Sequence, residues 1–571
     1  MRMLTGCAIS AAVLSLSLLA QQPPPPKETK EPTEKEKEEI DSGIPIASEV
    51  VRKACSPCHK IDEKQRMSRI SWRRTTPEGW EFTIKRMVEL NGLKIEPAEA
   101  REVLKYLANN LGLAPEEARA ASFEAEKRMI DYKYADKDTN EVCSKCHSMG
   151  RVISQRRSKG EWELLVAMHR GYYPLSDFQA FRRGGPPRTE PGPDGRPPDN
   201  RHPMDKAIPK LAEDLPLKTP EWSAWSANMR VPKLVGRWTF TGYQPGKGRY
   251  YGETVIKPGE KEDEAQTETR YVQVKTGETI TRHGRALVYT GFQWRGRSFE
   301  GSTDKEGWRE VMFLDRNQRE LTGRWFTGGY EETGIDVTMA RVGSDPMVLG
   351  LDRAALQTGG VRTVQIYGAN FPADLAAGAI DFGHGVAVKR VVSASPSLVK
   401  AEVEVAKDAT LGPRDVSVAG VVREGAAMIY DRIDGIKVKP QAGMARVGGI
   451  NFPKQYQQFE AVAFHNGADG KPDTKDDLNL GPVDVTWSIE EYTATYDDND
   501  KDYVGTLDSN GLFTPNVDGP NVKRRGNANN VGDVWVVATY KTPEGKVLRA
   551  RAHLLVTMPL YVKFDQPEVS Q

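Results

Sequence analysis

The sequence of 571 residues is too long for a single hydrophobic core, so it predicts three to five domains. Its 80 Lys and Arg residues balance 79 Asp and Glu residues, which gives a net charge of +1. This balance excludes the strong positive field that would favour nucleic acid or an anionic membrane as a partner.

The first 20 residues have the pattern of a secretory signal peptide. Arg2 supplies a positive start, an apolar run extends from Ala8 to Leu19, and cleavage is expected near Ala20. The run is shorter than the roughly 20 residues that a membrane-spanning helix needs. We therefore predict a signal peptide at residues 1–20 and export of the mature protein.

Residues 21–43 have the composition of a disordered, charged tether. Four consecutive prolines, Pro23–Pro26, are followed by mixed Glu and Lys without apolar periodicity. Such a segment cannot bury enough apolar surface to fold alone.

Two copies of the motif C-x-x-C-H follow, at Cys55–His59 and Cys143–His147. This motif is the attachment signature of c-type haem, in which two thiols form thioethers and the histidine becomes the proximal iron ligand. The motif predicts two covalent haems attached to Cys55, Cys58, Cys143 and Cys146, with His59 and His147 as proximal ligands. The fifth cysteine, Cys7, lies in the leader, so no disulfide framework remains. Export together with covalent haem indicates a bacterial periplasm.

An imperfect internal repeat organises the predicted all-α region, with cytochrome c units at residues 44–118 and 119–230. Each unit has a motif helix, a tryptophan-bearing helix and a final helix, and apolar residues such as Val103 and Leu107 recur at helical spacing. The second unit also contains a Gly- and Pro-rich insertion at residues 182–203, which predicts an irregular loop of unknown role.

The rest of the chain predicts three antiparallel β domains. Short runs rich in Thr, Val, Tyr, Phe and Trp alternate with Gly and Asp turns. We expect a barrel or strongly curled sheet at 231–343, an immunoglobulin-like sandwich at 344–435 and a C-terminal sandwich at 436–571.

The sixth iron ligand of each haem does not follow from the motif. In the first unit the candidates are Met67 and Met87. Met67 lies only eight residues after His59, which leaves little chain to reach over the porphyrin. Met87 lies on the tryptophan-bearing helix and is preferred, although ordinary core packing is the competing interpretation.

In the second unit the two repeats are aligned on their tryptophans. Met87 is seven residues past Trp80, and His169 is seven residues past Trp162. His169 is therefore the predicted sixth ligand, and the remaining options are Met168, His202 and Met204. A Met/His haem has a higher reduction potential than a His/His haem. The two haems are expected to differ in potential, with the first site the higher.

Other features of the sequence are less specific than the haem motifs. Seven arginines near the motifs can pair with haem propionates or dock an acidic partner, although a solvated basic face is the default: Arg66, Arg69, Arg73, Arg74, Arg151, Arg156 and Arg157. Two oxygen-rich loops, 469–473 and 497–500, are of a kind that can hold calcium, but they do not match the EF-hand pattern. The sequence contains no recognisable nucleophile–base pair, phosphate loop or dinucleotide fingerprint.

The order of these features resembles the alpha (dihaem) subunit of quinohemoprotein amine dehydrogenase. The resemblance is carried by the two haem motifs, the segment Trp162–His169, and a C-terminal stretch from Val485–Ile489 through Gly511–Pro515. It extends over nearly the whole chain beyond the leader and tether. The tether and the insertion at residues 182–203 do not match the family pattern.

This resemblance implies a periplasmic heterotrimer. In such a complex a small subunit carries a tryptophan-derived quinone that oxidises primary amines, and a β-propeller subunit completes the shell. The alpha subunit passes electrons from the quinone through its haems to a soluble cytochrome or cupredoxin, without an amine site of its own. The alternatives are a self-contained, peroxidase-like dihaem enzyme, and a dihaem cytochrome that serves another oxidoreductase.

Overall fold

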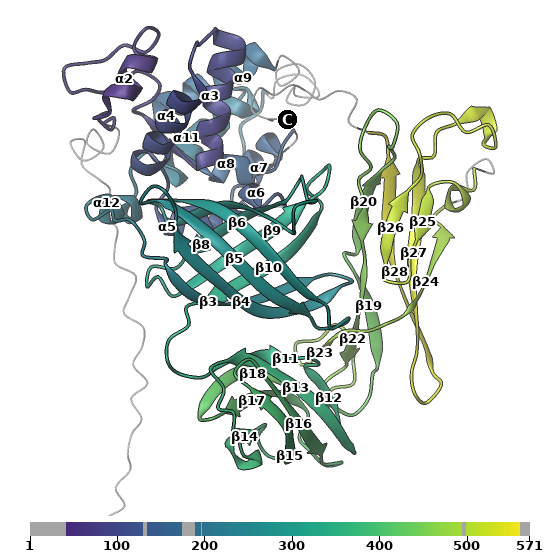
Figure 1. Cartoon of the computed structure of the whole chain (residues 1–571). Helices are drawn as coiled ribbons and strands as arrows, with labels where there is room; N and C mark the ends of the chain where they lie inside the picture. The colour runs from purple at the N-terminus through teal and green to yellow at the C-terminus, as the bar shows by residue number, and fades with distance from the viewer. Residues whose placement is uncertain are drawn as a thin grey trace, which may run out of the picture.

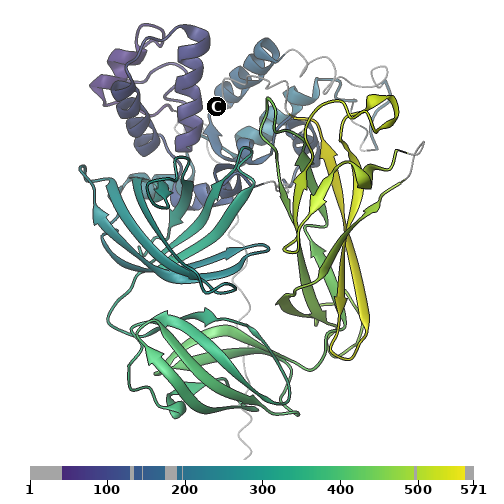
Figure 2. The ribbon, with the colours of Figure 1, turned by 45° about the vertical axis from the view of Figure 1, so that its right-hand side comes forward.

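The computed structural model describes residues 42–128, 134–144, 146–173, 189–193, 195, 197–493 and 498–559. The predicted signal peptide, nearly all of the tether and much of the insertion at 182–203 lie outside these residues. In Figure 1 a helix-rich region covers one end of a β-barrel, a β-sandwich lies beyond the barrel's other side, and a C-terminal β domain flanks the barrel. Figure 2 gives the same arrangement after a 45° turn.

The N-terminal region is rich in helices but contains a short β ladder, so the all-α prediction is not confirmed. The described helices are α2 (Glu49–Cys55), α3 (Pro77–Asn91), α4 (Pro97–Asn110), α5 (Pro115–Ala120), α6 (Ser122–Ala125), α7 (Lys137–Cys143), α8 (Gly150–Ile153), α9 (Lys159–Tyr172), α11 (Pro203–Asp214) and α12 (Pro220–Ser226). The ladder pairs β1 (Arg73–Thr75) with β2 (Gln155–Arg157).

Side-chain caps fix where several of these helices begin. The N-terminal backbone N–H groups of a helix lack intrahelical acceptors, and a Ser, Thr or Asp side chain can satisfy one of them. The capping residues are Ser48 for α2, Thr76 for α3, Asp136 for α7, Ser158 for α9 and Thr219 for α12. The tryptophan-bearing helices of the two units therefore start at equivalent places.

The β1–β2 ladder lies on a local two-fold axis that relates the two units. The spacing that carries Trp80 onto Trp162 also carries Arg74 onto Arg156, and these two arginines are paired in the antiparallel register. The correspondence between the two units extends to the C-terminal ends of their final helices, α4 and α11. The N–H of Thr75 donates to Leu111 O at 3.1 Å, and the N–H of Arg157 donates to Leu215 O at 3.2 Å.

A buried carboxylate, that of Glu117 on α5, lies at this axis. Arg74 donates to it through both terminal nitrogens, at 2.7 and 2.9 Å, and Arg156 approaches through Nε at 3.1 Å. The Thr219 hydroxyl and the Ala114 N–H each donate to it at 2.8 Å. Burial would raise the pKa of Glu117, but the hydrogen bonds and charge of the arginines outweigh burial and lower this pKa to about 2.

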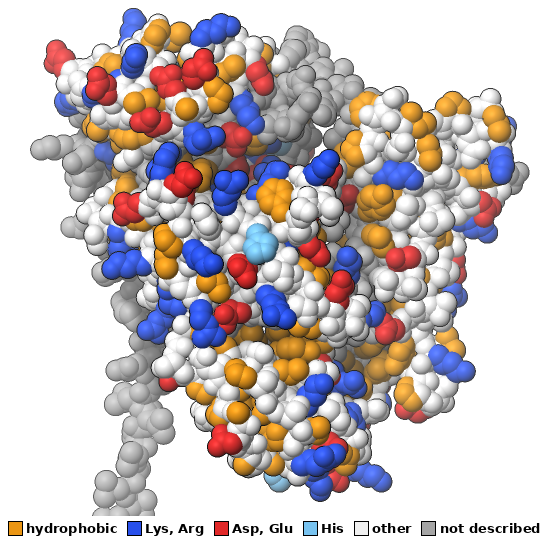
Figure 3. Space-filling view, viewed as in Figure 1, with side chains coloured by type: hydrophobic (Ala, Val, Ile, Leu, Met, Phe, Trp, Pro, Cys, Tyr) orange, Lys and Arg blue, Asp and Glu red, His pale blue; other side chains and the backbone are white. Residues whose placement is uncertain are grey.

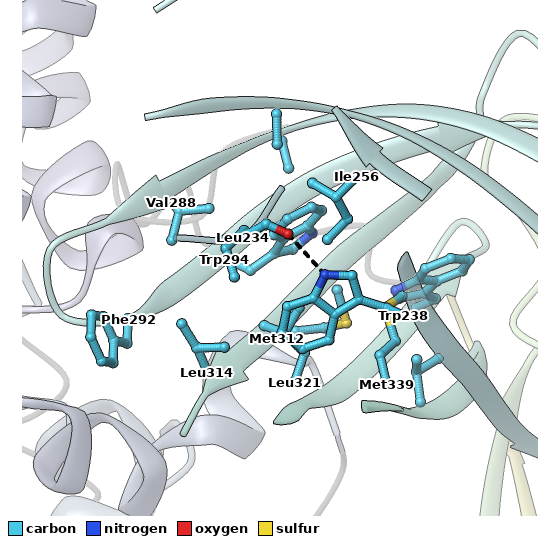
Figure 4. Packing of buried hydrophobic residues seen from close by; sticks show 14 of the residues in the cluster. Leu234, Trp238, Ile256, Val288, Phe292, Trp294, Met312, Leu314, Leu321 and Met339 are labelled. Atoms are coloured by element: carbon cyan, nitrogen blue, oxygen red, sulfur yellow. Dashed lines mark hydrogen bonds between the residues drawn. The ribbon is translucent and has the colours of Figure 1, made fainter. Parts of the chain in front are cut away.

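The predicted barrel is confirmed as a closed barrel, whose strands lie between Gly236 and Ala340. Its strands are β3 (Gly236–Gln244), β4 (Gly248–Pro258), β5 (Glu264–Gln273), β6 (Thr279–Tyr289), β7 (Gln293–Phe299), β8 (Trp308–Leu314), β9 (Glu320–Thr327) and β10 (Thr333–Ala340). Alternate residues point inward, as β5 illustrates by burying every second residue. Figure 4 shows its core, where Trp238 Nε1 donates to Leu234 O at 2.8 Å.

The helix-rich region closes one mouth of this barrel. Trp222 and Trp225 of α12 belong to the same buried cluster as the barrel's interior residues, and Trp225 meets Phe292 edge-on at 4.8 Å. Ion pairs join the two parts around the rim, between Arg295 and Glu78 and between Lys105 and Asp263. The barrel is therefore a platform on which the helices are fixed.

The two remaining β domains contain mixed sheets. The third domain packs two four-stranded sheets around one core, from β11 (Met347–Leu351), β12 (Ala355–Gln357), β13 (Val361–Ala369), β14 (Ile380–Asp381), β15 (Val386–Ser395), β16 (Leu398–Val405), β17 (Gly412–Val418) and β18 (Val421–Tyr430). The fourth contains β19 (Gly435–Lys439), β20 (Ala442–Arg446), β21 (Gln457–Gln458), β22 (Glu460–His465), β23 (Leu478–Pro482), β24 (Thr486–Glu491), β25 (Gly505–Leu507), β26 (Leu512–Pro515), β27 (Gly532–Lys541) and β28 (Val547–Thr557). Purely antiparallel sheets were expected, but β12 pairs with β18, and β20 with β28, in parallel.

Removing the buried carboxylate should destabilise the haem-loaded protein strongly. Glu117→Gln leaves two arginines without their counter-charge, and breaking a buried ion pair in this way costs about 3–5 kcal/mol. Chemical denaturation of the purified protein measures this loss. Glu116→Gln is the matched control, because Glu116 forms only an exposed pair with Arg316 and its loss should cost about 1 kcal/mol or less. Equal effects of the two substitutions would contradict the central role of Glu117.

Low pH should remove the stabilisation that the ionised Glu117 carboxylate provides. The pKa of Glu117 is about 2 in the folded protein, against an ordinary value of 4.5. The stabilisation is therefore present in full above about pH 4.5 and is lost as the pH falls toward 2. The difference in unfolding free energy between the wild type and Glu117→Gln should stay constant from pH 7 to 5 and shrink below that. A difference that does not change down to pH 3 would contradict this assignment.

Candidate functional site

Each haem motif begins at the last residue of a capped helix. α2 ends at Cys55 and α7 ends at Cys143. In the first motif the N–H groups of Cys58 and His59 donate back to Cys55 O, at 3.2 and 2.9 Å. The two cysteines and the histidine of this motif therefore share one turn of backbone at the helix end.

The first thiol of each motif lacks the lowered pKa that is typical of a redox-active dithiol. Burial raises the pKa of Cys55 to about 11 and that of Cys143 to about 12. Redox C-x-x-C motifs instead have a thiol of lowered pKa. All four motif cysteines are free of disulfides.

Three imidazoles are held in the tautomer that suits a metal ligand. Nδ1 of His59 lies 2.8 Å from Ser68 O, Nδ1 of His147 lies 3.0 Å from Ser148 O, and Nδ1 of His169 lies 2.8 Å from Leu165 O. Because a carbonyl oxygen can only accept, Nδ1 carries the proton and Nε2 keeps its lone pair. Histidines that bind metals in proteins are oriented in this way.

Burial also favours the neutral form of the two motif histidines. It is the largest influence on His59 and lowers its pKa, against the hydrogen bond to Ser68. The pKa of His147 is lowered first by burial, with the charges of Arg151 and His169 acting in the same direction. Neutral imidazole is the form that binds iron.

The second motif opens into a cavity of about 610 Å³, a volume typical of cofactor sites. The residues of the second unit that line this cavity include Cys143, Cys146, His147, Val152, Trp162, Leu165, Val166, His169, Met204, Ala207 and Leu211. Two thiols and two imidazoles thus face one largely apolar space. This donor set and this space fit a c-type haem.

The other wall of this cavity comes from the first unit. Phe82, Thr83 and Arg86 of α3 line it. The opposite face of the same helix carries Trp80 and Ile84, which pack in the core of the first unit. This helix therefore lies between the second cavity and the core of the first unit, and Figure 2 shows the helices of the two units on either side of this region.

The structure distinguishes among the four candidates for the sixth iron ligand of the second site. His169 and Met204 line the cavity with His147, whereas Met168 and His202 do not. His202 instead caps α11, where its Nδ1 accepts the Met204 N–H at 3.2 Å. Met204 is only 7% exposed and packs in the core of the second unit.

In the first site the two methionines have different surroundings. Met67 is fully buried in the core of the first unit, and its N–H donates to the Ser71 hydroxyl at 2.8 Å. Met87 is half-buried on α3, on the helix face that also carries Trp80 and Ile84. On α9 the residues at the same positions are Trp162, Val166 and His169.

Six of the seven arginines near the motifs pair with carboxylates. Arg74 and Arg156 bind Glu117, Arg69 and Arg157 bind Glu161, Arg66 binds Asp62, and Arg151 binds Glu124. Arg73, Arg151 and Arg157 line the cavity. The seven do not form a solvated basic face, because Arg73, Arg74, Arg156 and Arg157 are all buried.

The contribution of α3 to the second site was not predicted from the sequence. The signal for it is the spacing of Phe82, an apolar residue four positions from both Glu78 and Arg86 on an otherwise polar helix face. The role of Glu117 was not predicted either, because an acidic residue among helix-forming residues is normally exposed.

The second loop predicted to hold calcium, 497–500, contributes to a cluster of carboxylates. Among the described residues, Glu491, Asp498 and Asp500 bring carboxylate oxygens within 4.8 Å of one another. Asp500, however, already binds the Arg524 guanidinium and the Asp533 N–H. In the loop 469–473, the N–H of Asp469 donates to Asp476 and the N–H of Asp473 donates to Asp477.

The visible surface carries charges of both signs. Figure 3 shows basic and acidic side chains interspersed over the barrel and the neighbouring domains. On this face the mixture of signs agrees with the balanced composition. Within the described part of the chain, no helix is both long and apolar enough to span a bilayer.

Four family models match the chain in sequence order. The haem-binding model of the quinohemoprotein amine dehydrogenase alpha subunit matches residues 46–185. The models of alpha subunit domains II, III and IV match residues 232–342, 345–431 and 436–569. No curated protein sequence matches the chain.

Solved structures resemble parts of the chain only weakly. A redesigned β-barrel, mFAP1, bound to DFHBI has 17% identity and a TM-score of 0.17, and the match covers 19% of this chain and 94% of that one. A mixed-linkage glucan utilization protein, SGBP-B from Bacteroides ovatus, in complex with a heptasaccharide, has 10% identity and a TM-score of 0.19, with 56% and 60% covered. At such scores neither likeness extends to the chain as a whole.

Proposed function

Because this chain belongs to the family of quinohemoprotein amine dehydrogenase alpha subunits, we propose that it is the dihaem electron-transfer subunit of such an enzyme. It accepts electrons from a protein-derived quinone in a partner subunit and delivers them to a soluble cytochrome or cupredoxin. Amine oxidation takes place on the partner, and this chain holds no substrate site of its own.

The observation that carries the proposal is the second site. His147 and His169 line one cavity together with two thiols, and Nδ1 of each imidazole is held by a backbone carbonyl. Haem, when bound, supplies one-electron chemistry by cycling its iron between the ferric and ferrous states. The protein's contribution is to keep both Nε2 atoms unprotonated and to exclude water with apolar walls.

Each haem has an assigned set of residues. Cys55 and Cys58 attach the first haem, with His59 and Met87 as iron ligands. Cys143 and Cys146 attach the second, with His147 and His169 as ligands. The Met/His site is then the one of higher potential, and the His/His site the lower.

The family also guides the assignment of partners and compartment. We place the chain in a periplasmic heterotrimer with a small quinone-bearing subunit and a β-propeller subunit, after export directed by residues 1–20. The β domains serve as scaffold and contact surface. The rigid attachment of the helices to the barrel supports this role, because partner subunits can then dock on the barrel and sandwiches without disturbing the haem sites.

Mass spectrometry of the mature protein tests the haem count. Produced in a host that attaches c-type haem, the chain should carry two haem adducts. The double variant Cys143→Ser, Cys146→Ser should carry one. Ser144→Ala, within the same motif but without a thiol, should keep both. A wild-type protein with fewer than two adducts would refute the proposal.

Visible and electron paramagnetic resonance spectra separate this function from the alternative. An electron-transfer subunit should contain two six-coordinate, low-spin haems that do not react with peroxide. A high-spin haem that binds peroxide in the wild type would instead identify a self-contained, peroxidase-like enzyme.

Substitution of His169 tests the ligand assignment in the second site. His169→Gly should convert one of the two haems from low spin to high spin, and added imidazole should restore the low-spin spectrum. Met204→Leu, a volume-conserving change in the same cavity, should leave both haems low-spin. The reverse pattern would transfer the ligand role to Met204.

The same comparison applies to the first site. Met87→Leu should remove the thioether ligand and lower the potential of one haem, since thioether ligation raises it. Met67→Leu should leave the reduction potentials of both haems unchanged, because Met67 packs in the core of the first unit. A changed potential in Met67→Leu, with none in Met87→Leu, would reverse the assignment.

A further inference from the structure

The connection between α6 and the second haem motif contains a residue in an unusual backbone conformation. Lys127 has a φ angle of 54°, in the left-handed region that residues other than glycine rarely adopt. Arg324 of the barrel strand β9 donates through Nη1 to the carbonyl oxygens of Glu126 and Lys127, at 2.8 and 3.1 Å. Strained residues of this kind persist where their surroundings fix them, and they cluster at ligand sites. The barrel therefore holds the Lys127 backbone in place.

The side chain of Lys127 belongs to the wall of the second haem cavity. Lys127 and Phe82 both line this cavity, and Nζ of Lys127 lies 5.6 Å from the centre of the Phe82 ring. Within the part of the chain that the structure describes, the Lys127 ammonium has no ion pair and no hydrogen bond. An aromatic face attracts a cation but does not neutralise its charge. The cavity wall thus presents a cation without a counter-ion.

The carboxylates that line the same cavity are committed to other cations. Glu78 binds Arg295 of the barrel through both of its oxygens, and Glu124 pairs with Arg151. Lys127 interacts with Glu78 only at a distance, through its charge. Neither carboxylate therefore serves as the direct partner of Lys127.

The arginines that share this wall differ from Lys127, because the protein itself engages them. Arg73 donates to the Thr83 hydroxyl, and Arg157 donates through two nitrogens to the Gln155 side chain. An anion that enters the cavity consequently finds the Lys127 ammonium available without the loss of an existing hydrogen bond.

This cation matches the chemistry of the group that fits the cavity. A haem carries two propionate carboxylates, and burying a carboxylate is costly unless a cation or hydrogen-bond donors compensate its charge. A lysine ammonium is a compact charge with three donors on a flexible stem, so it can adjust to the position of a carboxylate. The cavity needs an anion for Lys127, and the haem supplies one.

We propose that Lys127 binds a propionate of the haem attached at Cys143 and Cys146, so that the barrel positions this haem through Arg324 and Lys127. This inference rests on the proposed function. Lys127 is a positioning residue: it orients the haem, and its charge raises the reduction potential. A positive charge beside the propionate disfavours the more positive ferric state.

Redox titration of the full, haem-loaded chain tests this role. Lys127→Asn removes the charge, and asparagine tolerates the left-handed backbone. It should lower the midpoint potential of the second haem, which is identified by its change in His169→Gly, and leave that of the first haem unchanged. Both haems should stay low-spin. Lys127→Arg keeps the charge and should retain most of the potential.

Lys127→Gly provides a second neutral variant. Glycine adopts this backbone conformation without strain, so the variant keeps the test available if Lys127→Asn does not fold. Its second haem should show the same lowered potential as in Lys127→Asn.

Lys137→Gln is the matched control. Lys137 begins the motif helix α7 of the second unit, but it is exposed and does not line the cavity. Solvent and salt screen an exposed charge, so its loss should leave the second potential unchanged. Equal shifts in Lys137→Gln and Lys127→Asn, or no shift in the neutral Lys127 variants, would overturn the inference. A high-spin second haem in Lys127→Asn would also overturn it, because Lys127 would then be an iron ligand.

The haem count separates this failure from a failure of the proposed function. A wild-type chain without the second adduct refutes the proposed function itself. A chain with both adducts, whose second potential does not respond to the charge at Lys127, refutes only the role of this lysine.

Discussion

The arrangement of the helix-rich region depends on one buried carboxylate between two arginines. Glu117 receives Arg74 from the first unit and Arg156 from the second, at the axis that relates them. Because Glu117 belongs to α5, which lies against the barrel strand β8, the same interaction fixes both units to the platform. Arg74 also lies 4.7 Å from the ring of Trp222, one of the residues that close the barrel mouth.

A buried ion group of this kind is weak evidence for stability alone. Well-packed apolar residues of the same volume are often at least as stabilising. The advantage of the ion group here is geometric: a bidentate guanidinium accepts few orientations of its carboxylate, whereas apolar side chains can slide past one another. Fixed geometry matters at this position because the other face of the same three-residue strands lines the cavity of the second site. A shift of β1 against β2 would change that site directly.

The sequence was sufficient to predict features that depend on short, local patterns. The two motifs, the equivalent spacing of Trp80 to Met87 and of Trp162 to His169, and the barrel all follow from such patterns. The Arg73–Thr75 and Gln155–Arg157 strands could not be predicted in this way, because three residues rich in arginine have neither the length nor the apolar alternation of a strand. The parallel pairs in the last two domains escaped prediction for a related reason: periodicity reports which face is buried but not which strands are neighbours.

The two units are related by symmetry but do not enclose their sites equally. Phe82 of α3 lines the second cavity, whereas Leu164, at the equivalent position of α9, is 43% exposed. Under the proposed ligands, His/His coordination lowers the potential of the second haem relative to the first. Enclosure of the second site by both units acts in the opposite direction, because a low dielectric disfavours the more positive ferric state. Under the proposed function, the difference between the two potentials is then smaller than the ligands alone imply.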